Sequence, residues 1–160
     1  MMEIRTVGDE VLRRQAKPVK AVTAAVRRLL DEMALTMRAE EGIGLAAPQV
    51  GVTKRILVAD IGEGLIELIN PVILHAEGYQ LGLEACLSIP DVVGEVERSE
   101  NIRLTGMNRD GHQIWMEASG LLARCLQHEI DHLDGILFTD RAIRILSEEE
   151  MAARNEVVLD

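Results

Sequence analysis

Apolar residues recur at intervals of three and four along residues 22–37, and this spacing predicts an amphipathic helix. The stripe consists of Val22, Val26, Leu29, Leu30, Met33 and Met37. Thr23 is a suitable N-cap, because its hydroxyl can accept a hydrogen bond from the first turn. Gly42 and Gly44 are expected to end the helix, since glycine readily adopts the left-handed conformation that follows many helices.

After Gly44 the pattern changes to short apolar runs that predict β-strands. Residues 55–59 and 65–74 form two such runs, with a Gly-Glu-Gly turn at 62–64 between them. Pro71 interrupts the second run, and proline cannot donate a hydrogen bond to a neighbouring strand. The second strand is therefore expected at a sheet edge, or broken at Pro71.

A hairpin is predicted farther along the chain. Residues 101–107 and 112–117 alternate between apolar and polar, and they flank Asn-Arg-Asp-Gly at 108–111. A turn signal between two alternating segments indicates antiparallel pairing. Small antiparallel or mixed sheets are therefore expected.

Two more helices are predicted after the hairpin. Ser119 is a suitable N-cap for a helix that continues to about Leu133, and Gly135 is expected to end it. The last helix is expected to begin near Ser147, where Glu150 would complete a capping box. Because helices and strands do not alternate regularly along the chain, an α+β fold is favoured over an α/β fold.

Composition and charge limit the classes of protein. A chain of 160 residues with 48% apolar and 28% charged residues is expected to form one globular domain spanning residues 1–160. The formal net charge of −10 argues against a nucleic-acid-coating surface, so direct nucleic-acid binding is not expected. The sequence shows no membrane span or signal peptide, and two cysteines provide no disulfide framework. A cytoplasmic protein without membrane contact is therefore expected.

The sharpest chemical signal is His-Glu-x-x-His at residues 128–132. Residues four apart share one face of a helix, so His128 and His132 can bind one cation while the Glu129 carboxylate holds a water molecule beside it. The alternative is an ordinary helix with two surface histidines. Helical-wheel geometry favours the metal site, because these side chains adjoin an apolar stripe that must face the core. The residues then expected nearer the outside are Ala123, Arg124 and Gln127.

Two histidines do not complete a metal site, so a third ligand is needed. Cys125 lies about 10 Å from His132 along the helix axis, too far for its short side chain, and is expected to be a small buried residue. Cys86, in a loop segment that ends at Pro90, can supply a thiolate and leave a fourth position for water, as in catalytic sites. Other candidate ligands are Glu148, Glu149 and Glu150, whereas His75 and His112 are expected to be surface or structural residues. The predicted α+β fold thus packs its small sheets around a central metal-binding helix, with an N-terminal and a short C-terminal helix.

Three segments of the chain resemble the motifs of peptide deformylases, in the order found in that family. They are Gly-Ile-Gly-Leu-Ala-Ala-Pro-Gln at 42–49, Glu-Ala-Cys-Leu-Ser at 84–88 and Gln-His-Glu-Ile-Asp-His at 127–132. The likeness extends from about Ile4 to Phe138. It implies an enzyme that removes the N-formyl group from the N-terminal formyl-methionine of newly synthesised proteins and releases formate.

The resemblance also implies the roles of the site residues. The implied ligands of one divalent metal per chain are Cys86, His128 and His132. The implied catalytic groups are Glu129 as acid/base, with the Gln49 side chain and the Leu87 backbone N–H as oxyanion donors. The residues implied to flank the bound peptide are Ile43 and Gly44. Fe(II) is the implied metal, although thiolate and imidazole ligands also suit Zn(II), Ni(II) or Co(II).

The chain departs from the family pattern at two positions. Ala85 replaces a usual glycine before Cys86, and Val93 replaces an arginine that helps many members to hold the peptide, so peptide preference is expected to differ. The resemblance also suggests that Asp131 pairs with Arg98 to support the metal ligands, and an ordinary exposed salt bridge is the alternative. Some members dock on the ribosome through a basic C-terminal helix, but residues 141–160 contain three arginines and five acidic residues, which disfavours such docking.

Two alternative functions remain open at this stage. A zinc endopeptidase could use the same helix, with a third ligand from the terminal glutamates rather than Cys86. An inactive deformylase-like binding module would not need Glu129, so the presence of this residue disfavours it.

Overall fold

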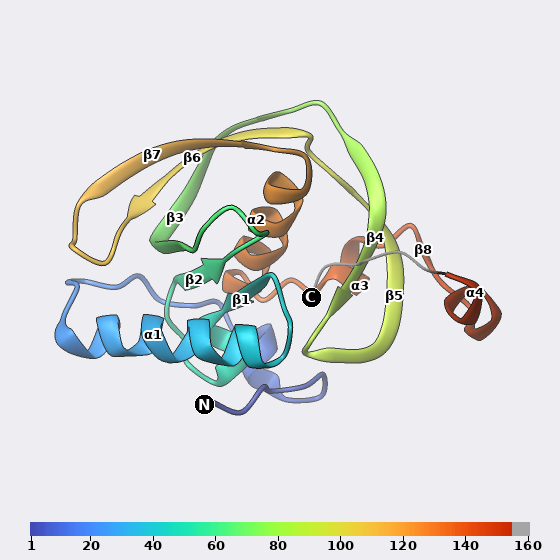
Figure 1. Ribbon diagram of the computed structural model, residues 1–160, viewed down its shortest axis with the longest axis horizontal. Helices are drawn as coiled ribbons and strands as arrows, with labels where there is room; N and C mark the ends of the chain where they lie inside the picture. Colours follow the sequence, from blue (N-terminus) through green and yellow to red (C-terminus); the bar gives the residue numbers. More distant parts are fainter. Residues whose placement is uncertain (155–160) are drawn as a thin grey trace.

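The computed structural model describes residues 1–154 and contains two antiparallel sheets and four α-helices (Figure 1). The helices are α1 (Ala24–Ala39), α2 (Gly120–Leu133), α3 (Phe138–Arg141) and α4 (Glu148–Ala153), with 3₁₀ helices η1 (Glu10–Arg13) and η2 (Ala47–Val50). The strands are β1 (Gly44–Ala46), β2 (Ile56–Ala59), β3 (Ile66–Glu77), β4 (Gln80–Cys86), β5 (Ile89–Arg98), β6 (Asn101–Met107), β7 (Gln113–Ser119) and β8 (Arg144–Ile145). The predicted α+β class is confirmed.

The sheets differ in size. One has five strands in the order β1-β2-β3-β6-β7, and the other has three in the order β4-β5-β8. All neighbouring strands in both sheets are antiparallel, and the predicted hairpin corresponds to β6 and β7. Within residues 1–154, no helix is both long enough and apolar enough to cross a membrane.

Helix α1 covers the β1–β2 end of the larger sheet, and four residues of the predicted apolar stripe, Val26, Leu30, Met33 and Met37, are buried there together with Ala34 and Thr36. The Thr23 side chain accepts a hydrogen bond from the backbone N–H of Val26, which confirms the predicted cap. The helix ends at Ala39, before the two glycines that were expected to end it. Glu41 takes the left-handed conformation instead, with φ of 59°, and Gly44 is the first residue of β1.

The first alternative for Pro71, an edge strand, is wrong, because β3 pairs with β2 over Ile66–Ile69 and with β6 on its other side, but the predicted interruption at Pro71 is present. The register shifts between Ile69 and Val72, which marks a bulge at Pro71. Asn70 there has a φ of 54°. The bulge tolerates the missing N–H, so the strand continues past the proline.

Strands β4 and β5 form a hairpin that the sequence analysis did not identify. Cys86 pairs with Ile89 at its tip, so Cys86 ends a strand instead of lying in a loop. Pro90 does not end the segment either, because the register between the strands shifts near it and Asp91 adopts a φ of 64°. A bulge again accommodates a proline that the sequence pattern marks as a break.

Helix α2 lies between the two sheets (Figure 1). It packs against β1, β2, β6 and β7, and its side chains also bond to β4. The expectation that Ala123 and Arg124 lie near the outside is wrong, because both are buried. Gln127 is half-buried, while Leu121 is exposed. A helix that other elements cover on several sides buries even its polar face. The position of one apolar stripe in the sequence does not predict this burial.

Candidate metal centre and its surroundings

Cys86, His128 and His132 come together in the interior. One ligand atom from each lies within 4.8 Å of the others, and all three residues are buried. The two histidines are one helical turn apart on α2, while Cys86 comes from the end of β4. The hairpin therefore supplies the third donor that one helix cannot.

The donor atoms fit a divalent cation. The Nε2 atom of His128 is buried and has no hydrogen-bond partner among residues 1–154, and a buried polar atom without a partner is costly. His132 Nε2 lies 3.3 Å from Cys86 Sγ. Burial and the neighbouring His128 lower the pKa of His132 well below its ordinary value, so its imidazole is neutral, the form that binds metals. One thiolate and two imidazoles form a common metal-binding set that leaves a position open.

A buried ionic network orients His128. Its Nδ1 atom donates to Glu84 Oε1 over 2.8 Å, which directs Nε2 toward the other donors. Arg98 binds both Glu84 oxygens, at 2.8 and 2.9 Å, and Arg124 Nη1 binds Oε2 at 2.6 Å. Arg98 also bonds to Asp131 at 2.6 Å, as predicted. The side chains of Glu84, Arg98, Arg124 and Asp131 thus hold the candidate metal ligand His128 in position.

The charge of Glu84 depends on these partners. Burial by itself raises the pKa of Glu84, but hydrogen bonds from Arg98 and His128, together with the charge of Arg98, lower it far below the ordinary value. The carboxylate is therefore ionised and acts as an acceptor for all its neighbours. Sequence reasoning missed Glu84 and Arg124 as members of the site; the only signal was an acidic residue in the mainly apolar segment before Cys86.

Glu129 lies on α2 and is fully buried. Its carboxylate lies against the backbone of Gly44 in β1, where a Cβ atom would be 2.5 Å from Glu129 Oε2 and 2.9 Å from Cys125 Sγ. Real Cβ atoms do not approach other atoms so closely. Gly44 thus leaves the space that the Glu129 carboxylate occupies.

Gln49 lies on η2 and is also fully buried. Its Oε1 atom accepts a hydrogen bond from the Ala46 N–H at 2.9 Å. Its Nε2 atom donates to Ser88 Oγ at 3.2 Å and lies 3.5 Å from Cys86 Sγ. The amide group is therefore held with its donor end toward Cys86. Ser88, which sequence reasoning gave no role, holds this amide.

Leu87 and Ile43 flank these groups along the chain. Leu87 directly follows Cys86 in the hairpin turn and is half-buried. Ile43 directly precedes Gly44, and its carbonyl accepts from Asp60 N–H at 2.8 Å and from Cys125 Sγ at 3.4 Å. The structure thus places the eight predicted site residues on four segments: β1 with the residue before it, η2, the β4–β5 hairpin and α2.

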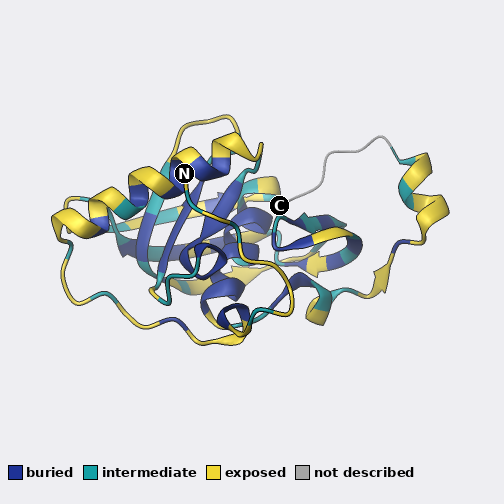
Figure 2. Cartoon of the chain, turned by 90° about the horizontal axis from the view of Figure 1, so that it is seen from below, coloured by how far each residue is buried: buried dark blue, intermediate teal, exposed yellow. Residues whose placement is uncertain are grey.

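The other candidate ligands lie elsewhere. His75 and His112 are exposed, as expected, and Cys125 is buried. The three glutamates of α4 are exposed, and this helix lies at the periphery of the molecule, without a buried residue (Figures 1 and 2). They are therefore not part of the buried donor group.

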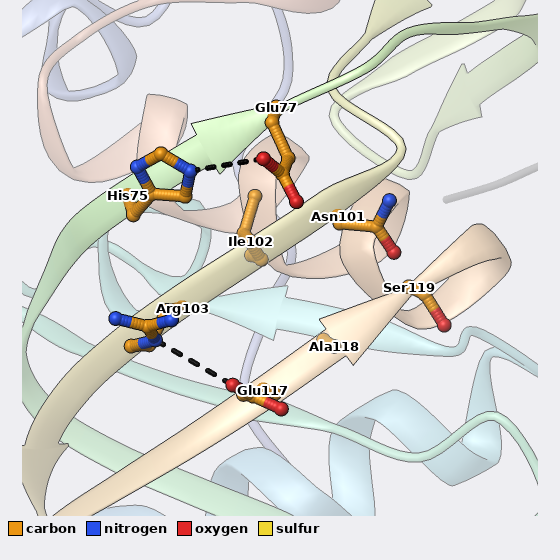
Figure 3. A pocket seen from close by; sticks show the side chains of 8 residues that line it. All are labelled: His75, Glu77, Asn101, Ile102, Arg103, Glu117, Ala118 and Ser119. Atoms are coloured by element: carbon orange, nitrogen blue, oxygen red, sulfur yellow. Dashed lines mark hydrogen bonds and ion pairs between the residues drawn. The ribbon is translucent and has the colours of Figure 1, made fainter.

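A hollow of about 260 Å³ opens on the outer surface of the larger sheet (Figure 3). His75 and Glu77 of β3 form one pair in it, at 3.2 Å, and Arg103 of β6 faces Glu117 of β7 at 3.5 Å. None of the predicted site residues lines this hollow.

The two departures from the family pattern have different surroundings. Among residues 1–154, the non-glycine residues with positive φ are Glu41, Asn70 and Asp91. Ala85 therefore adopts no backbone conformation that requires glycine. Val93 is buried in β5, with 2% of its surface exposed. The expected difference in peptide preference stays a prediction.

An α+β fold with a buried His-Glu-x-x-His helix and a cysteine from a neighbouring hairpin defines a metal-dependent hydrolase. Residues 1–148 match the family model described as "Polypeptide deformylase". The chain is 54% identical to a peptide deformylase of Acetivibrio thermocellus over 153 residues, which is 96% of this chain and 90% of that protein. It is 52% identical to that of Thermoanaerobacter pseudethanolicus over 154 residues, which is 96% of this chain and 97% of that protein. This chain belongs to the polypeptide deformylase family.

Solved structures agree with this assignment. The crystal structure of peptide deformylase from Thermotoga maritima superposes with a TM-score of 0.88 at 41% identity, covering 90% of this chain and 99% of that one. The peptide deformylase of Synechococcus elongatus in complex with actinonin gives a TM-score of 0.86 at 41% identity. The latter match covers 94% of this chain and 82% of that one.

Proposed function

We propose that this protein removes the formyl group from the N-terminal formyl-methionine of newly synthesised proteins, producing formate and a free amine. The observation that carries the proposal is the meeting of Cys86, His128 and His132 beside a buried Glu129, in a chain of the deformylase family. Residues 1–160 are proposed to form one catalytic domain, of which residues 155–160 lie outside the described part.

The three donors would hold one divalent cation. When bound, such a cation lowers the pKa of a water molecule toward about 7 and polarises a carbonyl oxygen. The identity of the cation is not determined by the donors, because Fe(II), Zn(II), Ni(II) and Co(II) all accept thiolate and imidazole. Fe(II) is the proposed physiological metal, on the strength of the resemblance of this chain to deformylases.

Residues of the chain itself carry out proton transfer, stabilisation of the oxyanion and binding of the peptide. The Glu129 carboxylate takes a proton from the attacking water and delivers it to the departing amine nitrogen. Gln49 Nε2 and the Leu87 N–H donate hydrogen bonds to the formyl oxygen as it gains negative charge. Ile43 and Gly44 line the peptide beside these groups. Removal of one such oxyanion donor typically lowers the rate about 10²- to 10³-fold.

The arrangement of the site disfavours the alternative function of a zinc endopeptidase. That function would take a third ligand from the terminal glutamates, which are exposed on α4, whereas Cys86 lies within 4.8 Å of both histidine donors. Docking on a ribosome through the C-terminal tail is not favoured either, since α4 begins with three glutamates.

The test is anaerobic measurement of formate release from a formyl-Met peptide by the protein loaded with Fe(II) or Ni(II). The parent protein is expected to release formate and to leave internal peptide bonds intact. Formate release without peptide cleavage supports the proposal, and peptide cleavage without formate release would support the endopeptidase.

Cys86→Ala is expected to lose most of its bound metal, because a thiolate ligand is removed from a three-residue site. Cys125→Ala is the matched control, since this second buried cysteine donates to the Ile43 carbonyl and is not in the donor group. Metal content per chain after dialysis is the measurement. Full metal retention by Cys86→Ala would remove Cys86 from the ligand set.

Gly44→Ala is expected to lower kcat without lowering metal content. The new methyl group would meet Glu129 Oε2 at 2.5 Å and displace the carboxylate, and a displacement of about 1 Å can cost roughly 100-fold in rate. Gly106→Ala is a suitable control, because its Cβ would meet the Ile69 carbonyl oxygen at 3.3 Å, on a strand that carries no site residue. An unchanged kcat in Gly44→Ala would show that Glu129 needs no such space.

A further inference from the structure

Positive charge is concentrated in one stretch of this acidic chain. Between Val11 and Leu30 the sequence has six cationic residues and no acidic residue. Residues 1–55 contain 10 cations and 7 acidic residues, whereas residues 56–160 contain 7 and 20, so their formal charges are +3 and −13 and sum to the −10 of the whole chain. The total charge therefore hides a basic region.

Cationic side chains without an ion pair gather in the same region. In residues 1–153 they are Arg14, Lys17, Lys20, Arg27, Arg28 and Lys54, and all six are exposed. The other ten arginines in that range each face a carboxylate. In a protein with 27 acidic residues, a segregated set of cations that form no ion pair within residues 1–154 points to an anionic partner from outside the chain.

Lys17, Lys20 and Lys54, the only three lysines of the chain, line one hollow of about 450 Å³, which we call the lysine hollow. Lys17 and Lys54 lie opposite each other in an isolated parallel β-bridge, where like charges destabilise each other. The backbone that carries them is fixed: Lys17 N–H donates to the Thr53 carbonyl at 3.0 Å, and the Asn70 side chain bonds both polar groups of the Val19 backbone. The fold therefore holds these repelling charges together.

The remaining members of the basic region lie on both sides of the hollow in sequence. Arg14 precedes the segment that lines it, and Arg27 and Arg28 follow in the second turn of α1. The residues that line the hollow include the apolar Val19 and Val26. Lysine stems pack on such apolar surface while their ammonium groups stay in water, where they can meet phosphates.

We propose that the lysine hollow and its flanking arginines bind double-stranded RNA through the phosphate backbone. Tyr79, Trp115 and Phe138 are the only aromatic residues of the chain, and none lines the hollow, so bases cannot stack there and single strands are disfavoured. Lysines contact phosphates as point charges and need no base sequence. The choice of RNA over DNA rests on the proposed function, because a newly made protein becomes available beside the RNA of the translating machinery.

A net charge of −10 opposes the coating of nucleic acid by the whole surface, but a local cluster can still neutralise a few phosphates. Binding is therefore expected to be weak and strongly dependent on salt.

The test is fluorescence anisotropy of a labelled RNA duplex of about 16 base pairs with the full metal-loaded chain at several salt concentrations. The triple variant Lys17→Gln/Lys20→Gln/Lys54→Gln is expected to bind at least tenfold more weakly at low salt. Its slope of log K against log salt should fall by about 3, one for each lost phosphate contact. The matched control is Arg103→Gln/Arg109→Gln/Arg144→Gln, which removes the same charge from ion-paired positions and should keep the parent affinity within about twofold.

Several results would overturn the proposal. They are no binding by the parent, equal loss in both triple variants, equal affinity for a DNA duplex of the same sequence, or tighter binding of a glutamate-rich peptide. The lysine variant should not unfold at a lower temperature than the parent, since it removes repulsion at the bridge. Its hydrolysis of a short formyl-Met peptide should equal that of the parent, so a failure of deformylation and a failure of RNA binding are separately visible.

Discussion

Glu129→Gln should lower kcat for a formyl-Met peptide by about 10²- to 10⁴-fold, the usual contribution of a positioned acid/base. Glutamine has nearly the same shape as glutamate and still fits beside Gly44, but it cannot accept the proton of the attacking water. Because Glu129 is not in the Cys86–histidine donor group, metal content should stay at one ion per chain. Formate release and metal analysis on the same preparation measure both effects.

The control for this variant is Glu117→Gln, which changes an exposed glutamate of β7 and should leave turnover unchanged. A loss of metal from Glu129→Gln would make Glu129 a ligand instead of a proton carrier. Turnover within tenfold of the parent would mean that another group moves the proton.

Glu84→Gln should lower the free energy of unfolding by about 3–5 kcal/mol, the usual cost of breaking a buried charge network by removing one partner. Glu84 is fully buried and accepts hydrogen bonds from Arg98, Arg124 and His128. The neutral amide leaves the buried Arg124 guanidinium without its carboxylate partner and leaves Arg98 with Asp131 alone. The same change frees the Nδ1 side of His128, so metal affinity should fall about 10- to 100-fold.

Chemical denaturation of the metal-free and metal-loaded proteins separates these two effects. Glu95→Gln is the matched control on β5, since its partner Arg144 is half exposed and the pair contributes at most about 1 kcal/mol. If Glu84→Gln and Glu95→Gln cost the same, the buried network does not stabilise the fold as described.

The elements that sequence analysis predicted well are those set by neighbouring residues. The Thr23 cap, the 108–111 hairpin turn and the capping box at Ser147 all occur as expected. Each depends on residues within a few positions of one another, where backbone hydrogen bonds and turn chemistry decide the conformation.

The incorrect predictions share a different cause. Pro71 and Pro90 lie inside strands because bulges absorb the missing N–H, and a bulge depends on the partner strand. Arg124 is buried because β4 brings Glu84 against that side of α2. A periodic pattern shows which residues share a face, but not how many faces of the helix will be covered.

By itself, the sequence determined that His128, Glu129 and His132 share one part of a helix surface, because the period of 3.6 residues decides this locally. Its motifs also indicated the family. Only the tertiary structure decided that Cys86 and Gln49 meet that helix, that Glu84 orients His128, and that Gly44 makes room for Glu129. These contacts join segments far apart in the chain, and they form only when strand register and helix packing bury the same groups together.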